Sequence, residues 1–359
     1  MDIAKIDENF KIETSLQQPG IRFYNIDDPP FKIYGVFKEN EFYRRIPQKI
    51  AEKISRGVSR LHTHTAGGRI RFITDSPYVA INVKTGRVGR MSHFTLIGSA
   101  GFDIYVRENG KEIYSGSFMP PYGMTDSFEQ LIEFKNNTYA APQRKLREIT
   151  INMPTYTEVK EVYVGLDENS VLEPPTPYAI EKPIVYYGHS ITQGGCATRP
   201  GYVYSSILSR RFHCDFINLG FSGNAKGEKE IADYIAGLDM KLFVYDYDYN
   251  APDADFLRST HEKMFRIIRQ AHPSIPIIML STTPKLQYAG SNEERVQIIY
   301  TTYQNALKSG DKNVYFINAS QVCDESDGHS GATVEGSHLN DIGFVCLANA
   351  LEEVMKPLL

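Results

Sequence analysis

Residues 184–195 read Ile184-Val-Tyr-Tyr-Gly-His-Ser-Ile-Thr-Gln-Gly-Gly195 and indicate the architecture of the C-terminal half. A short apolar run ends at Gly188, as in a buried strand of a parallel sheet. Ser190 then follows the carboxyl end of that strand, where α/β sheets bind ligands. A Gly-x-Ser tripeptide alone is weak evidence, because a serine in this place commonly caps the next helix. The rest of the chain must supply the context.

Apolar runs and helical spacing alternate from this strand to the C-terminus. Further strands are expected at 216–219, 242–245, 275–280 and 314–317, and helices at 202–213, 227–236, 255–270, 292–308 and 340–355. Apolar strands that alternate with helices are typical of a parallel sheet with a helical layer on each side. We therefore predict a three-layer, flavodoxin-like α/β domain.

The N-terminal half has a period of two instead. Alternating polar and apolar residues predict strands at 69–74, 79–83, 147–152 and 161–165. Residues 104–114 predict a hairpin, because Asn109-Gly110 suits the two positive-φ positions of a type I′ turn. Short strands with frequent turns favour an antiparallel β-sandwich or jelly roll.

The segment 171–183 is the expected linker between these two patterns. It contains four prolines, which exclude a helix and disfavour a central strand. We therefore predict a β-sandwich domain at residues 1–175 and an α/β domain at residues 176–359.

Composition limits the possible partners and compartments. The 359-residue chain has a formal net charge of -4, so its charge gives no indication of nucleic-acid binding. No apolar run in the sequence is long enough to span a membrane. Residues 1–10 lack the apolar core of a signal peptide, so we expect a cytoplasmic protein, with a removed leader as the alternative. The scattered cysteines are expected to be reduced: Cys196, Cys214, Cys323 and Cys346.

Further chemically useful residues follow the ends of later strands. Gly223 and Asn250 come after the second and third expected strands, and His338 comes after the fifth, three residues beyond Glu335. Each has an ordinary explanation, such as a strand-to-helix turn, an Asx-turn or a surface histidine beside a solvated acid. These ordinary explanations are much less plausible for the whole set, because the residues follow Ser190 in order at the ends of later strands.

The ordered Ser, Gly, Asn and His blocks resemble the SGNH (GDSL-like) hydrolase superfamily, from about residue 183 to the C-terminus. The resemblance implies that Ser190 is the nucleophile and His338 its base, with Glu335 in place of the family's triad Asp. It also implies an oxyanion hole from the Ser190 N–H, the Gly223 N–H and the Asn250 side chain. Physically, a serine hydroxyl needs such a base, and preorganised donors stabilise the oxyanion.

The N-terminal half carries a second resemblance. Gly101-Phe-Asp-Ile-Tyr105 matches the Gly-x-Asp-x-Tyr signature of the β-domain in bacterial two-domain SGNH-type esterases. The segment His62-Thr-His-Thr-Ala-Gly-Gly-Arg-Ile-Arg-Phe72 is also similar to that domain.

The chain departs from the family pattern at three places. His189 stands where the usual Gly-Asp-Ser has its acid, and we interpret it as structural or site-lining. The block around Asn250 lacks the common Gly-x-Asn-Asp form. Glu335 is one methylene longer than Asp, so a backbone carbonyl that orients His338, leaving a dyad, is the alternative.

Two other groups of residues have a metal-like or acid-pair pattern. His62 and His64 share one face of a possible strand, but without an evident third ligand we expect a structural role. Asp246 and Asp248, between tyrosines, are expected to be loop and site-wall residues. We expect no metal and no cofactor.

The expected activity is hydrolysis of a small acyl ester, with acetyl groups on carbohydrate implied by the resemblance. The expected partner is a small-molecule or oligosaccharide ester, and the sequence predicts no oligomeric state. An acyltransferase that uses the same nucleophile is one alternative. A glycan-binding protein with an inert hydrolase fold is the other.

Overall fold

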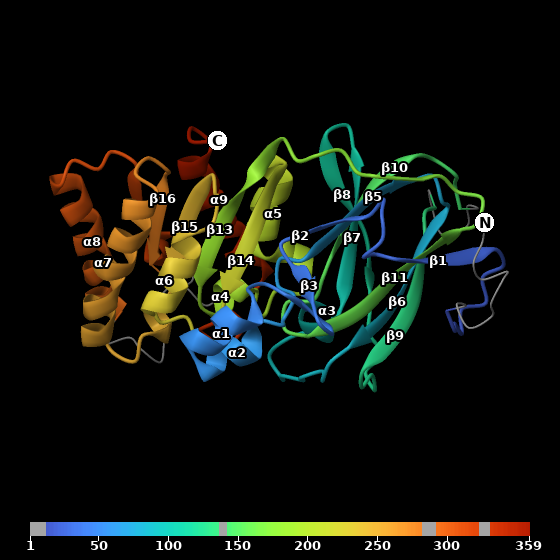
Figure 1. Cartoon of the computed structure of the whole chain (residues 1–359), viewed down its shortest axis with the longest axis horizontal. Coiled ribbons are helices and arrows are strands. Elements are labelled where there is room, and N and C mark those ends of the chain that lie inside the picture. Colours follow the sequence, from blue (N-terminus) through green and yellow to red (C-terminus); the bar gives the residue numbers. More distant parts are fainter. Residues whose placement is uncertain (1–11, 136–141, 282–291, 323–330) are drawn as a thin grey trace.

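The computed structural model describes residues 12–135, 142–281, 292–322 and 331–359 (Figure 1). The strand-rich N-terminal half and the mixed C-terminal half lie side by side along the long axis of the molecule. In these ranges no helix combines the length and apolar character needed to cross a membrane. Cys196, Cys214 and Cys346 are free thiols, while Cys323 lies outside the described residues.

Two antiparallel sheets build the N-terminal half. In the described residues the first sheet has the spatial order β1 (Ile21–Asn25), β11 (Val159–Asp167), β6 (Tyr78–Thr85) and β9 (Ser127–Glu133). The second has the order β12 (Leu172–Glu173), β5 (Arg69–Thr74), β10 (Arg147–Asn152), β7 (Phe102–Glu108) and β8 (Lys111–Phe118), and β2 (Lys32–Tyr34) also pairs with β5. Inward-facing side chains of both sheets form a shared core that includes Phe72, Ile81, Ile104, Ile151 and Val164. The predicted antiparallel β-domain is confirmed.

The predicted hairpin is the β7–β8 connection. Asn109 and Gly110 have φ values of 50° and 78°, as the two-residue type I′ turn requires. An asparagine tolerates this left-handed conformation better than most residues, and glycine has no side chain to oppose it.

A parallel sheet forms the centre of the C-terminal half. Across the described residues its strand order is β14 (Cys214–Gly220), β13 (Ile180–Gly188), β15 (Leu242–Asp246), β16 (Ile277–Ser281) and β17 (Val314–Asn318). The first strand in the chain is thus second in space, which is the flavodoxin-like order 2-1-3-4-5. The chain reverses direction across the sheet between β13 and β15, so ligands are expected beside the carboxyl end of β13.

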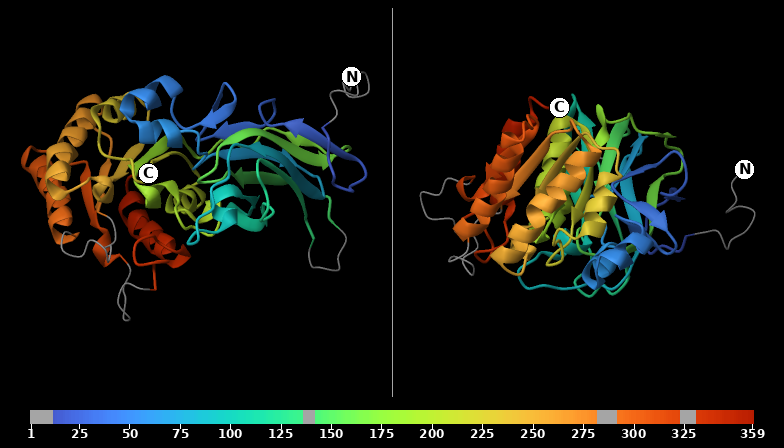
Figure 2. Two further views of the ribbon diagram at one scale, coloured as in Figure 1. Left: turned by 90° about the horizontal axis from the view of Figure 1, so that it is seen from below. Right: turned by 60° about the vertical axis from the view of Figure 1, so that its left-hand side comes forward.

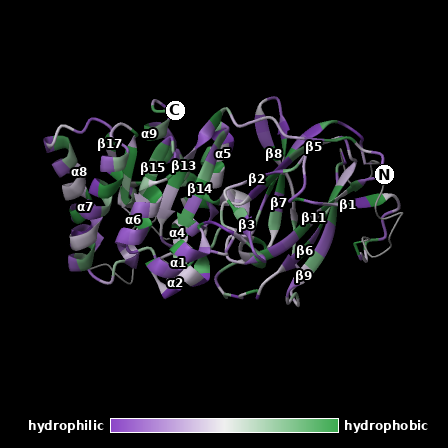
Figure 3. Cartoon of the chain, viewed as in Figure 1, coloured by the Kyte–Doolittle hydropathy of each residue, from purple (hydrophilic) through white to green (hydrophobic). Residues whose placement is uncertain are grey.

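Helices cover both faces of this sheet (Figure 2). One layer contains α6 (Lys229–Ala236), α7 (Ala254–Ala271) and α8 (Asn292–Lys308). The opposite layer contains α5 (Tyr204–Phe212) and α9 (Asp341–Met355). The strands between these layers are the most apolar part of this half (Figure 3), as burial on both faces demands. The predicted three-layer α/β fold is confirmed.

Short elements near residue 50 were not predicted. They are the hairpin β3 (Phe37–Glu39) and β4 (Phe42–Arg44) and the helices α1 (Gln48–Ile54) and α2 (Arg56–Leu61); α3 (Leu96–Ala100) was also missed. Each helix is too short to show a clear 3.6-residue period. Although α1 and α2 precede the β-domain strands β5 to β11, their apolar residues join the core beneath α6.

The expected linker 171–183 is too long. It contains β12, and β13 begins at Ile180 rather than at residue 184. The register of β13 against β14 shifts between Ile180 and Ile184, so Pro183, which has no N–H, falls in the irregular part of the ladder. The domain boundary near residue 175 stays a prediction.

The Gly101–Tyr105 motif holds a loop of the hydrolase half. Asp103, which is fully buried, accepts hydrogen bonds from the Gly201 N–H and from Asn152 Nδ2, both at 2.8 Å. Burial raises the pKa of Asp103 to about 6. A β-carbon at Gly201 would lie 2.5 Å from Tyr105 Oη, so the loop fits against the motif only with glycine there.

Replacing Asp103 with alanine should therefore destabilise the whole chain. The Gly201 N–H and the Asn152 amide would lose their acceptor in a buried place, and such losses cost about 1–3 kcal/mol of unfolding free energy. Urea denaturation measures the change. The exposed Asp126 is the control, since Asp126→Ala should change the unfolding free energy by less than about 0.5 kcal/mol. Equal effects of both substitutions would contradict the clamping role of Asp103.

Candidate active site

Ser190 begins the short helix α4 (Ser190–Gln193) directly beyond β13. The turn is tight because a β-carbon at Gly188 would lie 2.2 Å from Thr192 Oγ1 and 2.3 Å from the Asp246 carbonyl oxygen. Glycine is needed at position 188 for this close approach. The turn leaves the Ser190 side chain at the carboxyl edge of the parallel sheet.

His338 approaches Ser190 from the loop between β17 and α9. Its Nε2 lies 2.9 Å from Ser190 Oγ. Its Nδ1 lies 2.6 Å from Glu335 Oε1, and the same oxygen accepts the His338 backbone N–H at 3.2 Å. Gly336, with φ of 77°, lets the chain turn so that Glu335 faces His338. A carboxylate, rather than a backbone carbonyl, therefore contacts Nδ1 and favours the tautomer that leaves Nε2 able to accept a proton.

Gly223 and Asn250 lie at the same edge of the sheet. Phe221 links them to the nucleophile turn, because its N–H donates to the Gly188 carbonyl at 2.8 Å and its carbonyl accepts Asn250 Nδ2 at 3.1 Å. Gly223 has φ of 70°, and no heavy atom lies within 4 Å of the place of a β-carbon. In the described part of the chain no acceptor bonds the backbone N–H of Ser190 or of Gly223. Both groups are thus available to a ligand.

His189 points away from the site into the interior. Its Nδ1 accepts the Ile191 N–H at 3.2 Å, so the ring proton resides on Nε2, which lies 3.0 Å from Asp246 Oδ1 and 3.8 Å from Asp248 Oδ1. All three side chains are buried. The structural interpretation of His189 fits this arrangement, whereas the expected site-wall role of Asp246 and Asp248 is wrong, because both acids lie beneath the turn.

Gln193 connects the nucleophile helix to both halves of the molecule. Its Oε1 accepts the Ser222 N–H at 2.9 Å, and its Nε2 donates to the Thr155 carbonyl at 3.0 Å. The same Nε2 lies 3.2 Å from His64 Nδ1. Burial lowers the pKa of His64 to about 3, so this ring is neutral and accepts the amide hydrogen.

Tyr156 adds a second contact from the β-domain. Its hydroxyl donates to the Ser190 carbonyl oxygen at 3.2 Å. A β-carbon at Gly195 would lie 2.8 Å from the same hydroxyl, so the loop behind the nucleophile is fitted to this ring. Sequence reasoning missed Gln193 and Tyr156, because neither has a motif of its own in the β-domain or the hydrolase blocks.

His62 and His64 do not share a strand. His62 caps the C-terminus of α2, where Nδ1 lies 2.7 Å from the Ser59 carbonyl and Nε2 lies 2.5 Å from Arg44. His64 bonds to Gln193 instead. The two rings have separate structural partners and do not form a joint metal site.

Two other groups have ligand atoms close enough to hold a metal ion, among the residues that the structure describes. One is the buried set His189, Asp246 and Asp248, and the other is His93, Cys196 and His338. The first is enclosed beneath the nucleophile turn. The second group includes His338, whose side chain contacts Ser190.

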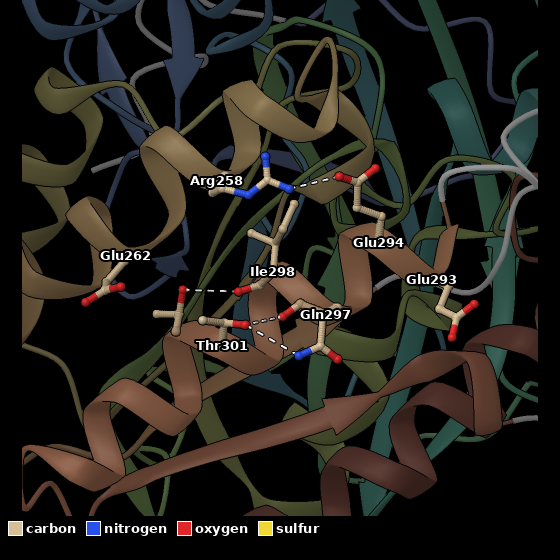
Figure 4. Close-up of a pocket in the computed structure, with 8 residues that line it drawn as sticks. Arg258, Glu262, Glu293, Glu294, Gln297, Ile298 and Thr301 are labelled. Carbon is tan, nitrogen blue, oxygen red and sulfur yellow. Dashed lines mark hydrogen bonds and ion pairs between the residues drawn. The ribbon is translucent and has the colours of Figure 1, made fainter.

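A surface hollow between α7 and α8 is separate from the site (Figure 4). Its wall is polar and charged, and Arg258 lies 2.8 Å from Glu294 across it. The lining residues are Arg258, Glu262, Glu293, Glu294, Gln297, Ile298, Thr301 and Thr302. None of them belongs to the Ser190 site.

Comparison with solved structures finds the same two-part architecture. A putative GDSL-like lipase from Bacteroides ovatus is 27% identical, with a TM-score of 0.83 over 94% of this chain and 98% of that chain. The salicylyl-acyltransferase SsfX3 of a tetracycline biosynthetic pathway is 18% identical, with a TM-score of 0.76 over 95% and 98%. A family two carbohydrate esterase from Clostridium thermocellum, in complex with cellohexaose, is 15% identical, with a TM-score of 0.58 over 81% and 92%. The last two likenesses show the fold.

Comparison with protein families gives the classification. Residues 21–172 match the N-terminus of SGNH-hydrolase-type esterases, and residues 181–356 match the GDSL-like lipase/acylhydrolase family. No curated protein matches the chain by sequence. Since the β-domain and the hydrolase domain are matched in this order and together span most of the sequence, the chain belongs to the SGNH (GDSL-like) hydrolase superfamily and is a carboxylic ester hydrolase.

Proposed function

We propose that the chain hydrolyses small acyl esters, acetyl esters above all, on carbohydrates through an acyl-enzyme on Ser190. The observation that carries this proposal is the 2.9 Å contact between Ser190 Oγ and His338 Nε2. The Glu335 carboxylate, 2.6 Å from Nδ1, supports it because it suits the orienting role of a triad acid.

The first step forms the acyl-enzyme. Ser190 Oγ attacks the ester carbonyl carbon while His338 Nε2 takes the hydroxyl proton. The protonated ring then gives that proton to the departing alcohol, and the acyl group stays on Oγ. In the second step a water attacks the acyl carbon while His338 Nε2 takes a proton from it. The ring then returns this proton to Ser190 Oγ as the bond between Oγ and the acyl carbon breaks, and the carboxylic acid leaves. Glu335 stabilises the positive imidazolium in both steps.

Three donors are proposed to bind the oxyanion of each tetrahedral intermediate. They are the Ser190 N–H, the Gly223 N–H and the Asn250 amide. Two observations support this assignment: Gly223 is exposed, and within the described ranges neither backbone N–H has an acceptor. The Asn250 amide donates one hydrogen to the Phe221 carbonyl, which steadies it and leaves its second hydrogen for the substrate.

The substrate class follows from analogy with neighbours of the same fold. One neighbour is a family two carbohydrate esterase crystallised with cellohexaose, and another is named an acetyl xylan esterase from Butyrivibrio proteoclasticus. These names describe those proteins, and here they guide the choice of a carbohydrate acetyl ester.

Acyl transfer is the second candidate, and the resemblance to a salicylyl-acyltransferase favours testing it. The same residues would serve, with an acceptor alcohol in place of water in the second step. Product analysis with an added alcohol acceptor separates the two reactions, because hydrolysis yields the free acid and transfer yields a new ester.

Removal of either proton-transfer partner should abolish turnover of 4-nitrophenyl acetate. Ser190→Ala and His338→Ala should each lower kcat by about a millionfold, and the double variant should lose little more, since the two groups act as a unit. Ser209→Ala, in α5, is the matched control and should keep wild-type kcat. Residual turnover above about a tenth of wild type in Ser190→Ala would contradict the proposal.

Asn250→Ala should lower kcat with little change in KM. Loss of one oxyanion donor typically reduces kcat by about 100- to 1000-fold. Asn250→Asp tests the same point, because a carboxylate cannot donate and would repel the oxyanion. Steady-state kinetics on the same aryl ester measures both variants. A change confined to KM would indicate that Asn250 binds substrate without stabilising the intermediate.

The substrate proposal predicts a preference for short acyl chains and sugar alcohols. Acetylated xylo- and cello-oligosaccharides should be deacetylated with higher kcat/KM than 4-nitrophenyl butyrate or octanoate. Acetate release measures the first class and nitrophenol release the second. Equal or better use of octanoate would overturn the assignment of acyl size, and turnover of aryl acetate alone would overturn the carbohydrate assignment.

A further inference from the structure

His93, Cys196 and His338 come from distant parts of the chain and meet beside the nucleophile. His93 lies in the β-domain segment between β6 and α3, and its ring centroid is 5.6 Å from that of His338. One nitrogen of each histidine and the Cys196 sulfur all lie within 4.8 Å of one another. His93 is exposed, His338 is half-buried and Cys196 is buried, so the group opens to solvent on one side.

We propose that these three side chains form an inhibitory site for Zn²⁺. Imidazole nitrogens and thiolates are usual ligands of zinc, and a site with three protein ligands keeps its fourth place for a water. Zinc–ligand bonds of about 2.0–2.3 Å place ligand atoms roughly 3.3–3.8 Å apart in a tetrahedron. In the structure the three ligand atoms lie within 4.8 Å of one another, so the side chains draw closer together when the metal binds.

The surroundings of His338 suit a zinc ligand. Nδ1 lies 2.6 Å from Glu335 Oε1, so Nε2 would bind the metal in place of its 2.9 Å contact with Ser190 Oγ. A carboxylate on the far nitrogen of a ligating histidine is the usual outer partner, because it fixes the ring and makes it more basic. The contacts that suit His338 to proton transfer thus also suit it to bind Zn²⁺.

Cys196 lies in the loop that follows the nucleophile helix α4. It has φ of 72°, in a region that non-glycine residues enter at a cost of about 1–2 kcal/mol, and it follows Gly194 and Gly195. When Zn²⁺ binds, the Zn–S bond replaces the S–H bond and one proton leaves to solvent.

The consequence for catalysis rests on the proposed function. Zn²⁺ on His338 Nε2 takes the lone pair that would accept the Ser190 proton. Serine then has no base, and turnover stops until a chelator removes the metal. Because binding and turnover are separate readouts, the metal site can be tested even if no ester is hydrolysed.

Calorimetric titration of the full-length chain with Zn²⁺ is the direct test. Wild type should bind one Zn²⁺ per chain, and His93→Ala and Cys196→Ser should each weaken binding by about tenfold or more, since even outer partners of a ligand contribute that much. Cys346→Ser, whose thiol lies in α9, is the matched control and should bind as wild type. Absence of saturable binding, or unchanged affinity in the His93→Ala, Cys196→Ser double variant, would overturn the site.

Turnover of 4-nitrophenyl acetate tests the inhibition. Zn²⁺ should suppress wild-type turnover and EDTA should restore it. His93→Ala and Cys196→Ser should keep basal turnover but need about tenfold more Zn²⁺ for half inhibition, in step with their weaker binding. Calorimetric binding without loss of turnover would overturn the inhibitory role. A chain that hydrolyses no ester at all would instead count against the proposed function, while the calorimetric result would still decide the metal site.

Discussion

A buried guanidinium joins the two halves and fixes the strand that carries part of the site. Arg45 follows β4 and is almost completely buried. It donates to the backbone carbonyls of Leu61, Asn218 and Gly220, and its guanidinium carbon lies 4.6 Å from the centre of the Phe221 ring. Burial lowers the pKa of Arg45 to about 9, so it still carries its charge at neutral pH. Among the described residues no carboxylate pairs with Arg45, so its desolvated charge depends on these carbonyl dipoles. The interaction in turn holds the three carbonyls in place.

The carboxyl end of β14 is thus positioned by a residue of the N-terminal half, three residues before Gly223. The same half supplies Thr155 and Tyr156, which contact Gln193 and the Ser190 carbonyl. These contacts explain why the β-domain is packed against the hydrolase domain instead of tethered to it. The nucleophile turn and the Gly223 turn share one rigid support, because Gln193 bonds to the backbone of both the β-domain and Ser222. Oxyanion donors work best when they need no rearrangement, and this support provides that rigidity.

The sequence predicted the elements that have a strong local period. The alternation of polar and apolar residues predicted β5 and β10 with their observed bounds, and the helix predicted at 292–308 coincides with α8. The order of the Ser, Gly, Asn and His blocks also predicted that Ser190 and His338 meet, since the carboxyl ends of parallel strands lie at one edge of the sheet. What could not be predicted depends on contacts between the halves. The roles of Arg45 and the meeting of His93 with Cys196 arise from how two domains pack, and no period or spacing encodes that.

The replacement at position 189 shows how a departure from a family pattern can be compensated in space. A cap at the start of α4 needs an acceptor for the Ile191 N–H, and an imidazole nitrogen provides one as a carboxylate oxygen would. With histidine in place of an acid at position 189, the second polar atom of the side chain is the Nε2–H donor instead of an acceptor oxygen. This buried donor would be unpaired without an acceptor beside it. Asp246 lies where it accepts that hydrogen, at 3.0 Å. His189 and Asp246 are therefore a matched pair, and an acid at position 189 would face the carboxylate of Asp246 with like charge. The departure at one position is thus intelligible only together with the residue at the end of β15.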